Sequence, residues 1–204
     1  KSLIGCRIPK NKIALELLKS VKFPIAAPSA NLSTKTSVTR YEDIDPKLRK
    51  NVFAINGNSL LGLESTVIYV IKNKIKILRL GSLTEEEIKK KIKNVGINFV
   101  KIKKISPGTQ KKHYSPNRPL RINIKKVKKN ESLLNFGKNN LSSIICNLNL
   151  SKKGSLIEAS KNFFHYLNIL DKTKCKGIAV AKIPSKGLGK TINDRLRRAT
   201  AKSN

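Results

Sequence analysis

The spacing of hydrophobic and polar residues predicts a mixture of short strands and helices in the first half of the chain. Residues 2–8 alternate as in a strand, whereas residues 11–21 carry Ile, Ala, Leu and Val on one helical face. Two capping boxes, each a threonine followed three residues later by a glutamate, predict helices over 39–44 and 84–95. Asp45-Pro46 is expected to end the first of these helices.

Two apolar runs between these helices are typical of a β-hairpin. Residues 65–71 and 75–80 are rich in isoleucine and valine, and the polar residues 72–74 join them. Residues 97–102 predict one further strand. An apolar run at 23–30 passes directly into a polar loop.

The pattern changes behind residue 119 to a simple alternation of strands and helices. We expect strands at 120–124, 142–148 and 177–183, and helices at 155–170 and 189–202. Strands that alternate with helices of this length predict a small layered α/β sheet.

The spacing also predicts which side chains of the last two helices face a core. For the first helix these are Leu156, Ala159, Phe163, Tyr166, Leu167 and Leu170. The last helix contains "INDRLRRA", in which Ile192, Leu196 and Ala199 form the apolar stripe and the arginines are expected on the solvated face. No catalytic role follows for this segment from its sequence.

Composition narrows the class of protein. The 204 residues contain no methionine, even at position 1, so we expect a fragment that has lost its N-terminus. No stretch approaches the roughly 20 apolar residues of a membrane helix. Cys6, Cys146 and Cys175 are odd in number and far apart, which favours reduced thiols in the cytoplasm over disulfides or a zinc site.

The formal net charge of +32 has two explanations. A basic surface binds nucleic acid by releasing counterions from phosphates. Alternatively, Lys, Asn and Ile are abundant together, as in proteins encoded by AT-rich genes. We favour the second explanation, because the basic residues are scattered and no aromatic RNA-binding motif is present.

Three loops of small polar residues could carry chemistry, because each follows an apolar run. They lie at 27–33, 62–67 and 78–82, and their hydroxyl and backbone N–H groups suit an oxyanion. Arg79 and Arg7 could add planar guanidinium groups for a phosphate or carboxylate. Any one of these loops alone would be explained as a turn. Neither common nucleotide-binding glycine motif is present.

Other catalytic signatures are weak. The sequence shows no paired carboxylates, no serine–histidine–aspartate signature and no metal-ligand cluster, and His165, among aromatic residues of its helix, is expected to be a packed or a surface histidine. The segment 106–119 reads as a stiff extended linker because of Pro107, Pro116 and Pro119. A simple linker does not explain the pair His113-Tyr114 within it.

Taken in order, six segments resemble the threonylcarbamoyl-AMP synthases in their longer, two-domain form. These are "RIP", "PSANLS", "GLESTVI", "LRLGSLT", "PGTQKKHYSP" and "GLGKTINDRLRRA". The resemblance implies an α/β fold: the C-terminal part of a YrdC-like twisted open sheet domain at 1–105, a linker or lid at 106–119, and a small Rossmann-like domain at 120–204. The chain departs from the family's usual residues at Thr34, Thr36, Val38, Leu80, Thr109, Gln110 and Lys111.

The resemblance also implies a reaction and its partners. Threonine and bicarbonate give a carbamate, which attacks the α-phosphate of ATP and releases pyrophosphate. Such a nucleotidyltransferase needs positioning and charge stabilisation more than a nucleophilic side chain. Magnesium is expected with the triphosphate, held partly by the nucleotide and not by a protein metal site. The product, L-threonylcarbamoyladenylate, passes to downstream tRNA-modifying transfer proteins in the cytoplasm, with no membrane involved. The fragment alone is expected to be inactive.

The resemblance assigns site residues by position. Arg7, the backbone of Ala27, and Ser65 are expected to bind threonine. The residues expected to bind ATP are Ser29, Asn31, Ser37, Thr66, Arg79, His113 and Tyr114. Two alternatives stay open: a basic module that binds RNA, including double-stranded RNA, without catalysis, and a regulatory relative that binds nucleotide without turning it over.

Overall fold

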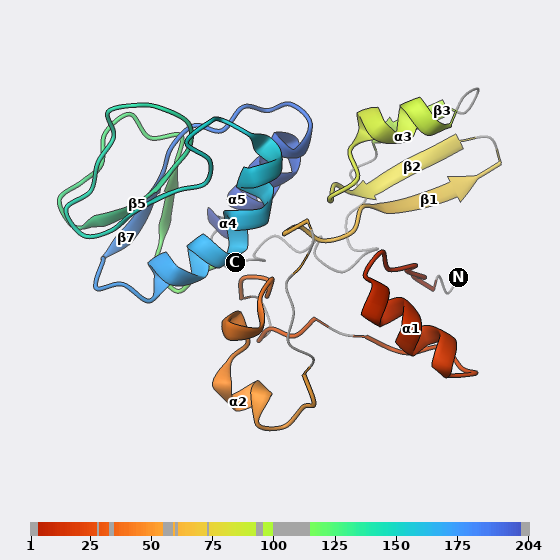
Figure 1. Ribbon diagram of the computed structural model, residues 1–204. Helices are drawn as coiled ribbons and strands as arrows, with labels where there is room; N and C mark the ends of the chain where they lie inside the picture. Colours follow the sequence, from red (N-terminus) through yellow and green to blue (C-terminus); the bar gives the residue numbers. More distant parts are fainter. Residues whose placement is uncertain are drawn as a thin grey trace.

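The computed structural model describes residues 4–200 apart from residues 28, 33–34, 55–58, 60, 73, 93–95 and 100–114. Its elements are, in chain order, α1 (Lys12–Ser20), the 3-10 turn η1 (Tyr41–Asp43), α2 (Pro46–Arg49), β1 (Val67–Ile71), β2 (Lys74–Arg79), α3 (Glu85–Lys91), β3 (Gly96–Phe99), β4 (Leu120–Ile122), β5 (Glu131–Asn135), β6 (Asn147–Asn149), α4 (Leu156–Asp171), β7 (Gly177–Val180) and α5 (Leu188–Thr200). The strands form two sheets, which lie apart from each other in Figure 1.

The first sheet has the order β1-β2-β3 and contains the predicted hairpin. β1 and β2 are antiparallel, with Val67 opposite Arg79, and β3 adds to β2 in parallel. Lys72, in the turn, has a φ of 50°, a conformation that a tight hairpin turn requires. The predicted strand at 97–102 is confirmed as far as Phe99, and its remaining residues lie outside the described ranges.

The capping box at Thr84 is confirmed and begins α3. The Thr84 hydroxyl accepts from the Glu87 N–H at 3.2 Å, and the Glu87 carboxylate accepts from the Thr84 N–H at 2.7 Å. The helix is shorter than predicted, because it ends at Lys91 with Ile92 as its C-cap. Val95 lies outside the described residues.

The predicted capping box at Thr39 is wrong. Its hydroxyl lies 3.4 Å from the Asp43 carboxylate, and only the short turn η1 follows. Asp45-Pro46 ends that turn but also begins α2, since the Asp45 carboxylate accepts from the Lys47 N–H at 2.8 Å. Proline suits the first position of a helix because it has no N–H to leave unpaired.

The predicted strand at 2–8 is also wrong for the residues that the structure describes. Residues 4–8 form no strand, and Ile4 and Ile8 are 89% and 92% exposed. A strand is held by hydrogen bonds to a neighbour, and no described strand pairs with this segment. The helix at 11–21 is confirmed as α1, which Asn11 caps, although none of its side chains is buried.

The second sheet has the order β4-β7-β5-β6, and all its strands are parallel. The predicted layered α/β arrangement is therefore confirmed, with α4 and α5 packed on one face. Two details of the prediction are wrong: residues 142–146 form no strand, and the fully buried strand β5 was not predicted. The sequence of β5 shows no alternation of apolar and polar residues, because a central parallel strand is buried on both faces.

One large apolar core lies between this sheet and the two helices. Its fully enclosed members include Leu134, Phe163, Leu167, Ile178 and Ile192, and the expected inward face of α4 is confirmed. Leu63, from the loop before β1, belongs to the same cluster. The loop that carries "GLEST" therefore docks into the core of the second half of the chain.

Helices α4 and α5 also face the first half of the chain, as Figure 1 shows. His165, for which the sequence left a packed and a surface position open, is buried and lies 3.0 Å from the Asp43 carboxylate. The Ser160 hydroxyl donates to the Leu61 carbonyl at 3.2 Å. The two halves are thus joined by polar contacts as well as by Leu63. In the described ranges, no helix combines the length and apolarity needed to cross a membrane.

An ion pair between the buried Glu131 and the half-exposed Arg121 in the second sheet makes the stability depend on pH. The Arg121 guanidinium donates to Glu131 at 2.8 and 2.7 Å, which holds the pKa of this carboxyl below its usual range against the opposing effect of burial. Because the folded pKa is the lower one, the stabilisation is present above the unfolded pKa of about 4.3 and disappears as the pH falls through the folded value.

We therefore expect Glu131→Gln to flatten the decline in the free energy of unfolding between neutral pH and the acid range. Urea denaturation at a series of pH values measures this decline. Arg121→Gln should flatten it similarly, and the double variant should add little. An unchanged acid decline in both single variants would contradict the assignment.

Candidate functional site

Ser65, which is predicted to bind threonine, and Thr66 and Arg79, which are predicted to bind ATP, lie where the hairpin begins and ends. Arg79 is the last residue of β2, and its guanidinium donates to the Ser65 carbonyl from Nη2 at 2.8 Å and from Nε at 3.3 Å. The antiparallel register accounts for this contact, because Val67, the first residue of β1, lies opposite Arg79, and Ser65 lies two residues before Val67. The structure thus brings together two residues that sequence reasoning assigned to different substrates.

The loop after β2 packs directly on the loop before β1. The Ser82 N–H donates to the Glu64 carbonyl at 2.8 Å. The Thr66 hydroxyl donates to the Leu83 carbonyl at 2.5 Å and accepts from the Leu83 N–H at 3.2 Å. The hydroxyl of Thr66 is therefore engaged in holding this loop, and its predicted contact with ATP stays a prediction.

Gly81 permits this close packing. A Cβ at this position would lie 2.3 Å from the backbone N of Thr66 and 2.4 Å from the backbone C of Ser65. We expect Gly81→Ala to lower the free energy of unfolding by about 1–3 kcal/mol, as overpacking does. Urea denaturation followed by circular dichroism measures the change. Gly5→Ala is the matched control, because nothing lies within 4 Å of its Cβ; equal effects of the two substitutions would refute the packing argument.

Glu64 joins this pair of loops to a third. Its Oε1 accepts from the Ser37 hydroxyl at 2.5 Å, and its Oε2 accepts from Arg195 Nε at 3.0 Å. Ser37 is one of the residues predicted to bind ATP. The predicted loop at 62–67, which packs on the predicted loop at 78–82, is therefore tied to the segment around Ser37 through a carboxylate that sequence reasoning did not select.

Asn31 has an acceptor without a partner. Its Nδ2 donates to the carbonyls of Leu32 and Lys35 at 3.1 and 3.0 Å. Its Oδ1 is buried, and within the described ranges it has no hydrogen-bond partner. Such an unsatisfied group costs about 1–3 kcal/mol, so a donor supplied by a ligand would stabilise it.

The remaining predicted residues are not joined to this group. Arg7, Ala27 and Ser29 are exposed, and among the described residues none of them forms a hydrogen bond to the Ser65–Arg79 pair. His113 and Tyr114 lie outside the described residues. Their predicted roles stay predictions.

The described end of the linker is firmly attached. The Asp171 carboxylate at the end of α4 accepts from the N–H groups of Asn117 and Arg118 at 2.9 and 2.7 Å. The Lys35 ammonium donates to the side chain of Asn117. The linker end thus lies beside the loop that carries Asn31 and Ser37.

Sequence reasoning missed Arg195, and its prediction that the arginines of α5 are solvated is wrong for this residue. Arg195 is 0% exposed, whereas Arg197 is exposed as predicted. A charged residue is seldom fully buried without a partner. Its partners are the adjacent Asp194 and, far away in sequence, Glu64 and the Leu80 carbonyl. Because two of these partners come from the first half of the chain, the local pattern around Arg195 does not indicate its burial.

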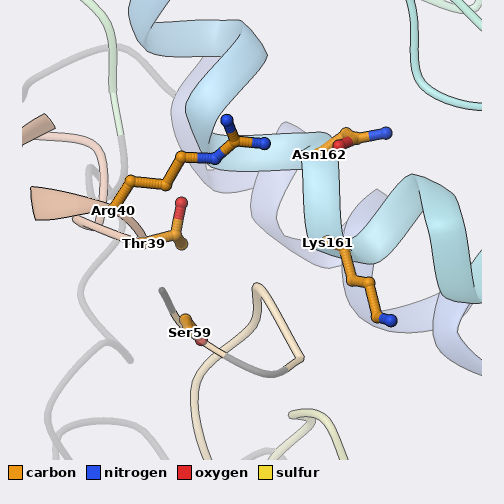
Figure 2. A pocket seen from close by; sticks show the side chains of 5 residues that line it. All are labelled: Thr39, Arg40, Ser59, Lys161 and Asn162. Carbon is orange, nitrogen blue, oxygen red and sulfur yellow. The ribbon is translucent and has the colours of Figure 1, made fainter. Parts of the chain in front are cut away.

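A cavity of about 220 Å³ lies between the first half of the chain and α4. Its lining is polar and partly cationic: Thr39, Arg40, Ser59, Lys161 and Asn162. Figure 2 shows Arg40 extending towards the helix that carries Lys161 and Asn162. None of the predicted site residues lines this cavity.

Comparisons with known proteins match both halves of the chain to one family. A family model described as "Threonylcarbamoyl-AMP synthase, C-terminal domain" matches residues 83–201, and the Sua5/YciO/YrdC model, described as "Telomere recombination", matches residues 1–81. The chain is 37% identical to the threonylcarbamoyl-AMP synthase of Bacillus subtilis over 58% of its own length and 36% of that protein. It is 29% identical to the Pyrococcus abyssi synthase over 97% of its length and 64% of that protein.

Solved structures are similar over nearly the whole chain. P. abyssi Sua5 complexed with L-threonine has a TM-score of 0.80 and 27% identity, covering 95% of this chain and 63% of that one. A P. abyssi Sua5 structure in which a histidine–tyrosine pair is replaced by alanines has a TM-score of 0.70 and 25% identity over 95% of this chain and 60% of that one. This likeness confirms the predicted α/β fold class. The chain spans 36% and 64% of the lengths of the two curated relatives. The chain belongs to the threonylcarbamoyl-AMP synthase family.

Proposed function

We propose that this chain contributes to an ATP-dependent synthesis of L-threonylcarbamoyladenylate. The threonine amine takes up the carbon of bicarbonate with loss of water, which gives a carbamate. A carbamate oxygen then attacks the α-phosphorus of ATP, and the bond to pyrophosphate breaks. The observation that carries the proposal is the contact between Ser65 and Arg79, which sets a residue expected at threonine against a residue expected at ATP.

The proposed roles follow the chemistry of each group. Arg7, the backbone of Ala27, and Ser65 would hold threonine, whose carboxylate a guanidinium binds well. The residues that would hold ATP, chiefly its phosphates, are Ser29, Asn31, Ser37, Thr66 and Arg79. The Ser65 carbonyl fixes the plane of the Arg79 guanidinium, which supports a role that depends on direction as well as on charge.

Magnesium belongs to this proposal as the companion of the triphosphate. The described residues contain no cluster of three or more His, Cys, Asp or Glu side chains that could hold a metal ion. Magnesium commonly uses only one or two protein ligands together with phosphates and water, all through oxygen. The unpartnered carboxamide oxygen of Asn31 is of the right type, and the nucleotide would supply most of the remaining ligands.

We also propose that residues 106–119 act as a lid that brings His113 and Tyr114 to ATP. Two observations support this: the linker end is tied to α4, and Lys35 ties it to the loop with Asn31 and Ser37.

The proposal divides the chain into 1–105 (catalytic), 106–119 (linker) and 120–204 (second domain). The reaction is proposed to take place in the cytoplasm, where tRNA-modifying transfer proteins would use its product.

The test uses a chimera, in which this chain replaces its matching region of the P. abyssi relative. The chimera should release pyrophosphate from ATP only when L-threonine and bicarbonate are both present. The net charge of +32 motivates one alternative, a basic RNA-binding module without catalysis. Absence of threonine-dependent pyrophosphate, together with RNA binding that weakens steeply with salt, would favour that alternative and refute the synthase.

A further inference from the structure

Helix α5 places a fully buried arginine against the loops of the proposed site. Arg195 is 0% exposed, and its polar contacts within the described part of the chain include Nε with Glu64 at 3.0 Å, Nη1 with Asp194 at 2.6 Å, and Nη2 with the Leu80 carbonyl at 2.5 Å. Two of these partners come from the first half of the chain. The guanidinium therefore bridges α5 and the two loops at the start and the end of the hairpin.

Each partner in the first half adjoins a residue of the proposed site. Glu64 precedes Ser65 and accepts from the Ser37 hydroxyl through its other oxygen. Leu80 follows Arg79, whose guanidinium binds the Ser65 carbonyl. Arg195 thus binds the Glu64 carboxylate and the Leu80 carbonyl. Glu64 is the chain neighbour of Ser65 and the hydrogen-bond partner of Ser37, and Leu80 is the chain neighbour of Arg79.

A second donor on the same face of α5 reinforces this arrangement. Thr191 lies one helical turn before Arg195, and its hydroxyl donates to the Gly81 carbonyl at 2.9 Å. Two successive carbonyls of the loop after Arg79 therefore receive donors from α5. This pair of contacts fixes the direction of the backbone at the end of β2.

Docking of the two halves does not account for a buried arginine. Removing a guanidinium from water costs several kcal/mol and is offset only by well-placed partners, so an apolar residue would often give equal stability. Leu63 and the Asp43–His165 pair already join the halves without it. What Arg195 adds is a fixed direction for a carboxylate and a carbonyl.

We propose that Arg195 is a positioning residue for the synthase site. Through Glu64 and the Leu80 carbonyl it holds Ser37, Ser65 and Arg79 in the arrangement that binds the substrates. The second half of the chain then contributes to synthesis, because α5 carries the arginine that orients the substrate-binding loops. The inference rests on the proposed function, but the effect of Arg195 on the loops that carry Glu64 and Leu80 can be tested without an activity assay.

The first measurement is hydrogen–deuterium exchange in the 204-residue chain. In Arg195→Gln, exchange should become at least about tenfold faster in peptides from 36–39, 62–66 and 80–82, while β5 and β7 keep their protection. Arg195→Lys should show an intermediate effect, since it keeps the charge but loses the fork. Arg197→Gln, with the same loss of charge at an exposed position of α5, is the matched control and should match the unmodified chain.

The second measurement separates positioning from folding in the chimera described above. Arg195→Gln should lower kcat/KM for ATP by about 10- to 100-fold, and Arg195→Lys should recover part of the loss, with melting temperatures recorded for each variant. If Arg195→Gln does not fold, Glu64→Gln, which removes the same ion pair but keeps the shape, replaces it.

Two results would overturn the proposal: unchanged exchange of the three loops in a folded variant, or loss of protection spread equally over β5 and β7. The exchange experiment keeps its meaning even if the unmodified chimera makes no product. That outcome would count against the proposed function alone.

Discussion

Replacing Arg79 by alanine is expected to lower threonine-dependent pyrophosphate release by about 10²- to 10³-fold, the usual effect of removing one preorganised donor from a developing negative charge. The side chain stands at the end of a strand, and the Ser65 carbonyl orients its guanidinium at 2.8 Å. Its loss removes a cation from the proposed phosphate site and also the bond that fixes Ser65. Both substrates should therefore bind less well.

The chimera with the P. abyssi relative is the assay system, and kcat and KM are measured separately for ATP and threonine. Arg197→Ala is the matched control, because Arg197 is exposed and its loss changes the net charge equally. Arg79→Lys should retain part of the activity, since it keeps the charge without the planar fork. Equal activities of Arg79→Ala and Arg197→Ala would show that overall charge, and not this position, matters.

Leu63→Ala is expected to lower the free energy of unfolding by about 2–5 kcal/mol, the range for a buried leucine whose cavity does not collapse. Leu63 is 7% exposed and belongs to the large core cluster with Phe163, Ile192 and Leu196. It reaches this cluster from the loop of the proposed site. The loss should therefore also weaken the attachment of the "GLEST" loop to the second half.

Urea denaturation followed by circular dichroism measures the effect on the free energy of unfolding. Leu61→Ala is the control, because Leu61 lies in the same loop but is 38% exposed; its replacement should cost under about 1 kcal/mol. A similar small cost for Leu63→Ala would mean that the loop does not depend on the core for its position.

Local pattern was sufficient where an element depends on its own residues. The hairpin, the capping box at Thr84 and the two long helices α4 and α5 follow from periodicity and capping chemistry. Thr39 has the same capping pattern but begins no α-helix, because its hydroxyl is engaged by Asp43 and a proline follows shortly after. A cap signals a helix only when the residues behind it continue one.

Tertiary contacts decided the rest. Strand β5 is buried on both faces, so its sequence shows no alternation, and the segment 4–8 shows alternation but has no described neighbour to pair with. Likewise, Arg195 pairs with the adjacent Asp194, but its partners Glu64 and Leu80 are more than a hundred positions away, so its burial does not follow from the local sequence.

The site shows the same division. The ordered motifs and the resemblance led to Ser37, Ser65 and Arg79, and the hairpin register explains why the last two meet. Glu64 lies inside one of those motifs, yet only the fold reveals that its two oxygens serve different loops. The residues that organise the site were thus harder to predict than the residues proposed to touch substrate.

The most direct test of the synthase proposal is to follow the carbon of bicarbonate. The chimera is incubated with ATP, magnesium, L-threonine and ¹³C-labelled bicarbonate, and the nucleotide products are analysed by mass spectrometry. The proposal predicts an adenylate that carries both the threonine and one ¹³C atom, formed in step with pyrophosphate. Turnover of ATP without incorporation of the label into a threonine adduct of AMP would contradict it.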